Sequence, residues 1–232
     1  MNIEKYIKNR SSFLTEREDI EWSNFWIDRA NVNSSKRILL IGDSTSRMIR
    51  STFSKISGCP VDLLATSSAL HDELFINQIN AFFNQSKYKY ETIFVQLGHH
   101  AVYNKMGGDY EENDYLIFEN EYSALIEFLK QFTSNIILES ILLSVVPYKH
   151  FSYLYRKLRI KEKEDVHANY IKIRKNEIIK KIALEKKLPF CDISSFMQKT
   201  KYVHKDHIHY EKAAMPVIVQ ELIKYIVCKH SN

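Results

Sequence analysis

Short apolar runs alternate along the chain with longer segments whose apolar residues recur at helical spacing. The runs are rich in β-branched and aromatic residues and end at turn-forming residues, which is typical of buried strands. Five strands are expected, at residues 37–41, 61–65, 91–97, within 135–146, and at 188–193. Helices are expected at residues 45–56, 70–83, 115–132, 165–187 and 210–228. We expect residues 98–114 to form a loop and residues 149–164 to form an irregular or partly helical basic segment.

Strands that alternate with helices predict a mostly parallel sheet covered by helices on both faces. The predicted fold class is α/β, a three-layer α/β/α sandwich with a five-stranded, mostly parallel sheet. Residues 1–35 are more polar, and aromatic residues one helical turn apart, such as Trp22 and Trp26, predict a helical extension there. Residues 36–232 are expected to form one main domain.

Composition limits the function classes. The chain has 232 residues, 45% of them hydrophobic and 26% charged, which is typical of a globular domain. The net charge is +5, but basic and acidic residues are interspersed and no basic stripe with interleaved aromatic residues occurs. Nucleic acid is therefore not an expected partner, whereas a mildly basic surface is compatible with an anionic ligand.

Cysteine usage and the first residues bear on location. The three cysteines, Cys59, Cys191 and Cys228, are odd in number and lack metal-site spacing, so we expect free thiols in a reducing compartment. The first residues lack the apolar core of a signal peptide, and no apolar run is long enough to span a membrane. A cytoplasmic location is the expectation.

One serine occupies a position suited to catalysis. The apolar run at 38–41 ends in Gly42-Asp43-Ser44, and the next residues have a helical pattern. This places Ser44 beside a helix N-terminus, where backbone N–H groups stabilise negative charge. A serine nucleophile needs a base, and Asp206-x-x-His209 offers one before the last helix. The structural alternative is that Ser44 is a plain helix cap.

The combination of Gly-Asp-Ser near the start and Asp-x-x-His near the end resembles the SGNH/GDSL hydrolase family, over residues 36 to about 225. The resemblance implies an SGNH/flavodoxin-like fold and a serine acyl-transfer site. Ser44 would be the nucleophile, His209 the base, and Asp206 the group that orients His209. The Ser44 N–H would be one oxyanion donor.

The chain departs from the family pattern in the second block. That block has a glycine whose N–H joins the oxyanion hole, whereas residues 65–69 here contain none. The N–H of Ser67 or of Ser68 is the candidate replacement, and the two remain open at this point.

A second departure lies in the third block, where the family has Gly-x-Asn and this chain has Gly98-His99-His100. His100 stands at the asparagine position, and a histidine N–H can donate the same hydrogen bond. The expected oxyanion hole comprises Ser44, His100, Ser68 and Gly98; the alternative for His100 is a buried residue that orders the loop. A Gly-His pair in this block also resembles the PC-esterase branch, whose members include polysaccharide O-acetyltransferases.

The histidines allow a metal site as an alternative. They are His99, His100, His204, His207 and His209. No carboxylate or cysteine set completes a recognisable zinc signature, so neither a metal nor a bound cofactor is expected.

The fate of an acyl-Ser44 intermediate separates the function hypotheses. Acetyl-CoA is a donor available in the cytoplasm, and basic residues at 149–163 suit an anionic donor or a sugar. The leading hypothesis is an O-acetyltransferase that moves acetyl from acetyl-CoA to a hydroxyl of a bacterial capsular or other surface polysaccharide. A carbohydrate O-acetyl esterase is the alternative, and a non-catalytic glycan-binding relative is the second.

Overall fold

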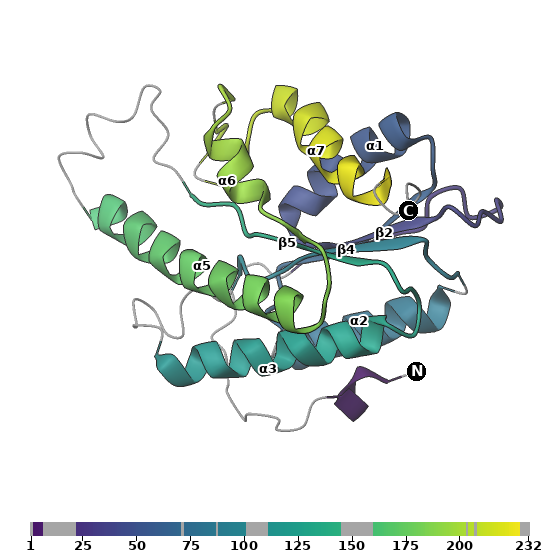
Figure 1. Ribbon diagram of the computed structural model, residues 1–232, viewed down its shortest axis with the longest axis horizontal. Helices are drawn as coiled ribbons and strands as arrows, with labels where there is room; N and C mark the ends of the chain where they lie inside the picture. Colours follow the sequence, from purple (N-terminus) through teal and green to yellow (C-terminus); the bar gives the residue numbers. More distant parts are fainter. Residues whose placement is uncertain are drawn as a thin grey trace.

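The computed structural model describes residues 2–6, 22–70, 72–86, 88–100, 111–144, 160–202, 204–206 and 208–227 of the chain (Figure 1). At residues 160–167 the backbone alone is described.

A six-stranded sheet forms the centre of the molecule, with strand order β1-β3-β2-β4-β5-β6. All neighbouring strands are parallel except β1, which pairs antiparallel with β3. The strands are β1 (Ser23–Trp26), β2 (Ile38–Gly42), β3 (Val61–Thr66), β4 (Thr92–Gln96), β5 (Ile136–Glu139) and β6 (Phe190–Cys191). The expected mostly parallel sheet is confirmed.

Helices cover both faces of the sheet (Figure 1). One face carries α2 (Glu73–Gln85), α3 (Glu112–Leu129) and α5 (Ile160–Glu185). The other face carries α1 (Ser44–Ser57), α6 (Ile193–Gln198) and α7 (Met215–Val227). The expected three-layer α/β/α architecture is therefore confirmed.

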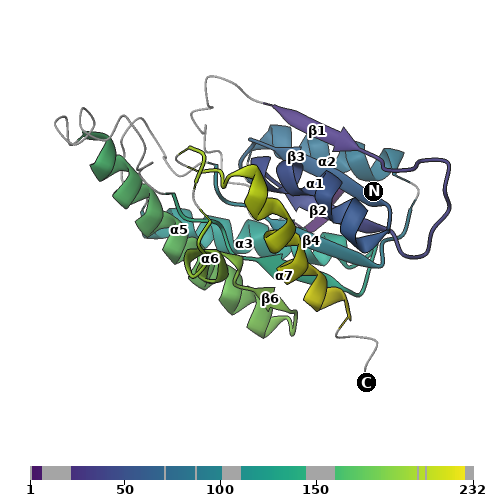
Figure 2. The same cartoon turned by 90° about the horizontal axis from the view of Figure 1, so that it is seen from above.

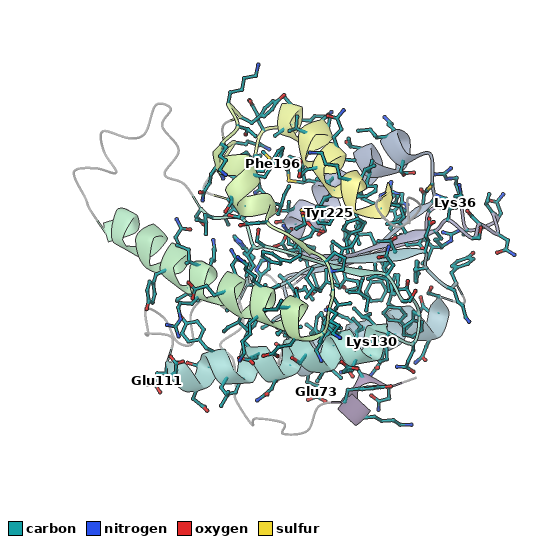
Figure 3. The ribbon with its side chains drawn as sticks, in the orientation of Figure 1. Lys36, Glu73, Glu111, Lys130, Phe196 and Tyr225 are labelled. Atoms are coloured by element: carbon teal, nitrogen blue, oxygen red, sulfur yellow. The ribbon has the colours of Figure 1, made fainter. Side chains whose placement is uncertain are left out.

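Each face of the sheet has its own hydrophobic core, and side chains fill both spaces between the layers (Figure 3). Every residue of the central strands β2 and β4 is buried, as expected for strands covered on both faces. Alternate residues divide between the cores, so that Leu39 belongs to the core under α2 and α3 while Leu40 belongs to the core under α1 and α7. In Figure 3, Phe196 of α6 and Tyr225 of α7 lie on one side of the sheet, and Lys130 lies on the other.

The expected count of five strands and the expected helix in the first 35 residues were wrong where the structure can be described. Residues 23–26 are β1, the edge strand seen beside β3 in Figure 2. All four residues of β1 are exposed, and its hydrogen bonds to β3 hold it in place, with Ser23 opposite Thr66 and Trp26 opposite Leu63. The one described helix before it is the short 3-10 segment Ile3–Tyr6, and residues 7–21 lie outside the described part of the chain.

Several other boundaries differ from expectation. The strand expected within 135–146 is limited to β5, and residues 140 to 144 belong to neither a helix nor a strand. Helix α2 begins at Glu73 rather than at residue 70, because Asp72 caps it by accepting from the Leu74 N–H. The closing helix begins later than expected, after the 3-10 turn Lys212–Ala214, and α6 was not anticipated. Most of the basic segment at 149–164 lies outside the described residues, and α5 already begins at Ile160.

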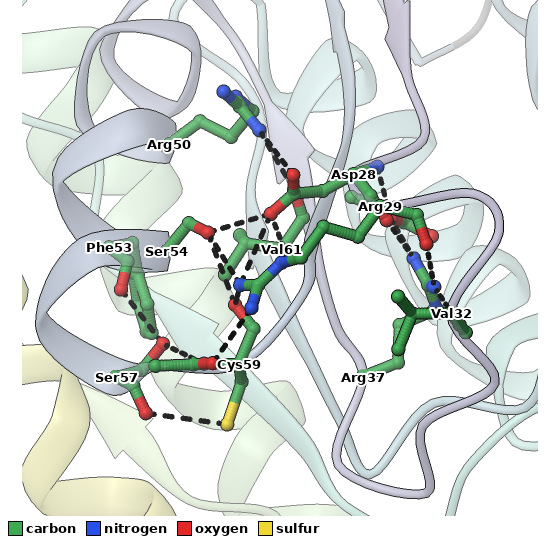
Figure 4. A network of polar contacts seen from close by, with 12 residues as sticks. Asp28, Arg29, Val32, Arg37, Arg50, Phe53, Ser54, Ser57, Cys59 and Val61 are labelled. Atoms are coloured by element: carbon green, nitrogen blue, oxygen red, sulfur yellow. Dashed lines mark hydrogen bonds and ion pairs between the residues drawn. The ribbon is translucent and has the colours of Figure 1, made fainter.

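A buried ion pair secures the amino ends of β2 and β3. Arg37 Nη1 donates to Asp62 Oδ1 at 2.7 Å, and both side chains are fully buried. The same guanidinium donates to the Asp28 and Val32 carbonyls, and Asp28 in turn accepts from Ser54 and Val61 (Figure 4). The network thus ties the segment between β1 and β2 to helix α1. It lies at the end of the sheet opposite Ser44, since Arg37 precedes β2 and Ser44 follows it.

Candidate active site

Ser44 lies at the turn between β2 and α1, as the sequence predicts. It is the first residue of α1, and Asp43 caps the helix by accepting from the Thr45 N–H at 2.8 Å. As the first residue of the helix, Ser44 carries an N–H group that has no acceptor within the helix, and the helix dipole favours negative charge at this end. Gly42 is required by close packing, because a Cβ atom there would lie 2.1 Å from Ser46 Oγ and 2.9 Å from the Gln96 carbonyl oxygen.

Asp206 and His209 lie on one tight turn before α7. Asp206 Oδ1 accepts from the backbone N–H groups of Ile208 and His209, at 2.9 and 2.7 Å. A bridge between His204 and Tyr210 closes the base of this turn. The imidazole of His209 folds back onto the carboxylate, with Nδ1 at 2.8 Å from Asp206 Oδ2. The turn therefore fixes both the carboxylate and the ring that it faces.

The structure brings the predicted nucleophile and base into contact. His209 Nε2 lies 2.6 Å from Ser44 Oγ. With Nδ1–H donating to Asp206, Nε2 is the nitrogen that accepts the Ser44 hydroxyl proton. A serine, a histidine and a carboxylate in this order form the geometry that converts a hydroxyl into a nucleophile for acyl transfer.

Hydrogen bonds keep the Asp206 carboxylate ionised. Burial raises the pKa of Asp206, but the hydrogen bonds from His209 and Ile208 outweigh it and hold that pKa below its usual value. The side chain of Asp206 is 46% exposed and that of His209 is 25% exposed, so solvent reaches both groups. The neighbouring Asp43 differs, because burial raises its pKa while the charge of His100 opposes that shift.

The third block forms a sharp turn after β4. Gly98 has a φ of +116°, a conformation that L side chains rarely adopt, and its neighbour His99 is buried. The His100 ring packs edge-on against Trp22, with centroids 6.3 Å apart, and against His99 at 5.6 Å. Burial, followed by the charges of Lys172 and His100, lowers the pKa of His99 well below its usual value, so His99 is neutral.

The second block does not supply the donor that the sequence predicts. The Ser68 N–H donates to Thr66 Oγ1 at 2.9 Å, and the Ser67 N–H donates to the Trp22 carbonyl at 3.0 Å. Both N–H groups are used within the protein because β1 runs beside β3 and the chain turns after Thr66. We therefore withdraw Ser68 from the expected oxyanion hole. Gly98 shapes the turn through its positive φ, and the donor roles of Ser44 and His100 stay predictions.

Comparison with solved structures identifies the fold, whereas no family model matches the sequence and no curated protein matches it either. A protein from Slackia heliotrinireducens described as an SGNH hydrolase aligns at a TM-score of 0.56 and 12% identity, over 83% of this chain and 100% of that one. An acetylxylan esterase from Geobacillus stearothermophilus aligns at 0.53 and 11% identity, over 83% and 94%. A GDSL-like lipase from Bacteroides thetaiotaomicron aligns at 0.53 and 20% identity, over 84% and 89%. The fold is that of the SGNH hydrolases.

Several residues around this SGNH fold's site were missed in the sequence. Trp22 lies between His100 and Arg47, whose guanidinium carbon is 4.8 Å from the indole ring. Arg47 is one helical turn after Ser44, a spacing that could have marked it. Lys172 and Lys175 on α5 are buried close to His99, but the same helix also carries the exposed Lys180 and Lys181, and no sequence signal distinguishes the two pairs.

The described part of the chain contains neither a metal-ligand cluster nor a membrane-spanning helix. In the described ranges, no three histidine, cysteine or carboxylate side chains are arranged to hold a metal ion, and His207 lies outside them. Of the described helices, none has both the length and the apolar character that a membrane crossing requires. Cys59 and Cys191 are free thiols, and Cys228 lies outside the described residues.

Proposed function

We propose that this chain is a serine-dependent acyl-transfer enzyme of the SGNH type that acts on acetyl esters of carbohydrate. The observation that carries the proposal is the 2.6 Å contact between Ser44 Oγ and His209 Nε2, backed by Asp206. Two further observations support the proposal. The Gly-Asp-Ser and Asp-x-x-His motifs resemble those of the SGNH/GDSL family, and the fold is that of the SGNH hydrolases. An acetylxylan esterase with the same fold supports a carbohydrate ester as substrate.

The residues would act in two half-reactions. Ser44 Oγ attacks the ester carbonyl carbon as its proton passes to His209 Nε2, and the imidazolium is stabilised by Asp206. The resulting oxyanion lies before the N-terminus of α1, where the Ser44 N–H donates to it, and we assign His100 as the second donor. Collapse of the tetrahedral intermediate breaks the ester C–O bond, His209 returns the proton to the leaving sugar oxygen, and acetyl-Ser44 remains.

For the second half-reaction, the exposure of the site favours hydrolysis of acetyl-Ser44. The side chains of His209 and Asp206 are partly exposed, so water can approach the acyl-enzyme and lose its proton to His209. The product would be acetate, and the enzyme a carbohydrate O-acetyl esterase.

Transfer to a sugar hydroxyl is the second candidate, and a specific observation favours it. The Gly98-His99-His100 block resembles the branch that contains polysaccharide O-acetyltransferases. In this case acetyl-CoA would acylate Ser44 and a polysaccharide hydroxyl would replace water. The basic residues at 149–159 that suit such a donor lie outside the described part of the chain.

One assay separates the two candidates and tests the proposal. The purified protein is incubated with acetyl-CoA plus a panel of bacterial polysaccharides, and separately with acetylated xylo-oligosaccharides. Acetate release from the acetylated sugars establishes the esterase, whereas thiol release that requires a glycan, with acetyl appearing on that glycan, establishes the transferase. Ser44→Ala must abolish either activity, and Ser51→Ala, an exposed position on the same helix, is the matched control. Turnover that survives Ser44→Ala contradicts the proposal.

A further inference from the structure

Two lysines of α5 are buried close to the candidate active site. Lys172 is 2% exposed and Lys175 is 1% exposed. Removing an ammonium group from water is costly unless good contacts compensate, so the position of a buried lysine is informative about what it holds. Lys175 Nζ donates to the Gly98 carbonyl at 3.1 Å and lies 5.0 Å from the centre of the Phe118 ring.

The Gly98 turn that accepts this hydrogen bond is tightly enclosed. A Cβ atom on Gly98 would lie 2.9 Å from Ile141 and 3.0 Å from Phe118. The positive φ of Gly98 sets the direction in which the chain continues to His99 and His100. A small rotation about Gly98 would therefore displace both imidazoles relative to Ser44.

The same face of α5 holds a second segment at this edge of the sheet. The Asn169 side chain accepts from the Ser144 N–H and donates to the Ser144 carbonyl, both at 2.7 Å. The Asn176 side chain likewise accepts from the Ile141 N–H at 2.7 Å and donates to the Ile141 carbonyl at 3.0 Å. Lys172 Nζ donates to Ser144 Oγ at 2.5 Å. Helix α5 thus fixes the segment after β5 and the turn after β4 together.

We propose that Lys175 is a positioning residue for the Ser44 reaction, because its hydrogen bond to the Gly98 carbonyl holds the His99-His100 turn in place beside Ser44. The inference rests on the proposed function and extends it to a residue that does not touch the substrate. Charges that face Lys175 come from Lys172 on its own helix and from Asp114 on α3. Burial, and then Lys172, lower the pKa of Lys175 to about 7, while Asp114 opposes the shift. A neutral amine keeps its N–H donors, so the bond to Gly98 persists in both protonation states.

Paired substitutions separate the hydrogen bond from mere packing. Lys175→Met removes the donor, whereas Lys175→Gln keeps a neutral donor on a chain of similar length. We expect Lys175→Met to lower kcat by roughly 10- to 100-fold with KM nearly unchanged, and Lys175→Gln to recover most of that loss. Lys181→Met is the control and should leave kcat unchanged, because Lys181 lies on the same helix as Lys175 but pairs with Glu119 of α3 near the surface.

A measurement that does not depend on turnover completes the test. Long-range proton–nitrogen NMR spectra report each imidazole, and we expect the His99 and His100 signals to shift in Lys175→Met and to return toward their original positions in Lys175→Gln. Equal turnover and equal imidazole spectra in the Met and Gln variants would overturn the proposal, as would losses of activity that only follow losses of stability. If the unmodified protein showed no Ser44-dependent turnover, the proposed function would fail. The imidazole spectra would then still decide whether Lys175 holds the turn.

Discussion

His209 Nε2 and Ser44 Oγ lie 2.6 Å apart although 165 residues separate them in the chain. The parallel sheet accounts for this contact, because Ser44 follows β2 and the turn of His209 follows β6 and α6, all at the same edge. Ligand sites in open α/β sheets lie outside the carboxyl ends of the strands for the same reason. The two groups reach each other because the fold brings two motifs that are distant in the sequence to one edge of the sheet.

Replacing Asp206 by asparagine tests the role of the carboxylate. An amide can present its NH2 group to Nδ1, which favours the tautomer with the proton on Nε2 and leaves no acceptor for the Ser44 hydroxyl. We expect Asp206→Asn to lower kcat by about 10²- to 10⁴-fold, with KM changed much less. Glu211→Gln, an acid-to-amide change two residues after His209, is the control. Steady-state kinetics on an acetyl ester measure the effect, and a loss of less than tenfold would remove Asp206 from the site.

The pH dependence of stability tests the environment of Glu139. Burial, and then the charge of Asp43, raise the pKa of the Glu139 carboxyl to about 8 from an ordinary value of 4.5. Between those values the folded state holds a proton that the unfolded state has released, so the free energy of unfolding falls as pH rises across this window. The effect is on the order of 1.4 kcal/mol per unit of pKa shift.

Glu139→Gln should remove this contribution because an amide does not titrate. Urea denaturation from about pH 5 to about pH 8 should show the variant gaining stability relative to the unmodified protein as pH rises. Glu121, whose pKa burial also raises to about 8, leaves a residual slope that both proteins share. Identical slopes in the two proteins would show that Glu139 does not hold a proton in the folded state.

A double-mutant cycle tests the buried pair of Arg37 and Asp62. Asp62→Asn leaves a fully buried guanidinium without its charge partner, and we expect it to destabilise the protein by about 3–5 kcal/mol. Adding Arg37→Met should recover part of this loss, because the uncompensated charge is then gone. Urea denaturation measures all four corners of the cycle. Strictly additive losses of stability would mean that the two charges do not interact. The kcat of the folded fraction should not change in any variant, because the pair lies at the end of the sheet opposite Ser44.

Much of the fold could be predicted because its strands are buried on both faces. Residues 38–41, 61–65 and 92–96 are apolar or β-branched except for Asp62 and Gln96, and each lies in a strand as expected. Strand β1 could not be predicted, because its four residues are exposed and Trp26 has helical spacing from Trp22, which precedes the strand. Its conformation comes from hydrogen bonds to β3, a tertiary contact that leaves no periodic signal in the sequence.

The residues of the candidate site could likewise be predicted only in part. Ser44, Asp206 and His209 could be predicted because they belong to short motifs with fixed offsets from a strand or helix. The failure of Ser68 as a donor depends on Thr66 Oγ1 and on the path of β1, neither of which the motif contains. Lys175 resembles the exposed lysines of α5 in sequence, and its contact with Gly98 becomes visible once α5 is packed against the sheet.

Trapping the acyl-enzyme tests the central claim most directly. The protein is mixed with an activated aryl acetate, quenched in acid within the first turnover and digested, and the peptides are analysed by mass spectrometry. We expect one acetyl group on Ser44, absent in Ser44→Ala and accumulating in Asp206→Asn only at a much reduced rate. Acetylation of another residue, or turnover without any acetyl-Ser44, would contradict the account of this protein as a serine acyl-transfer enzyme.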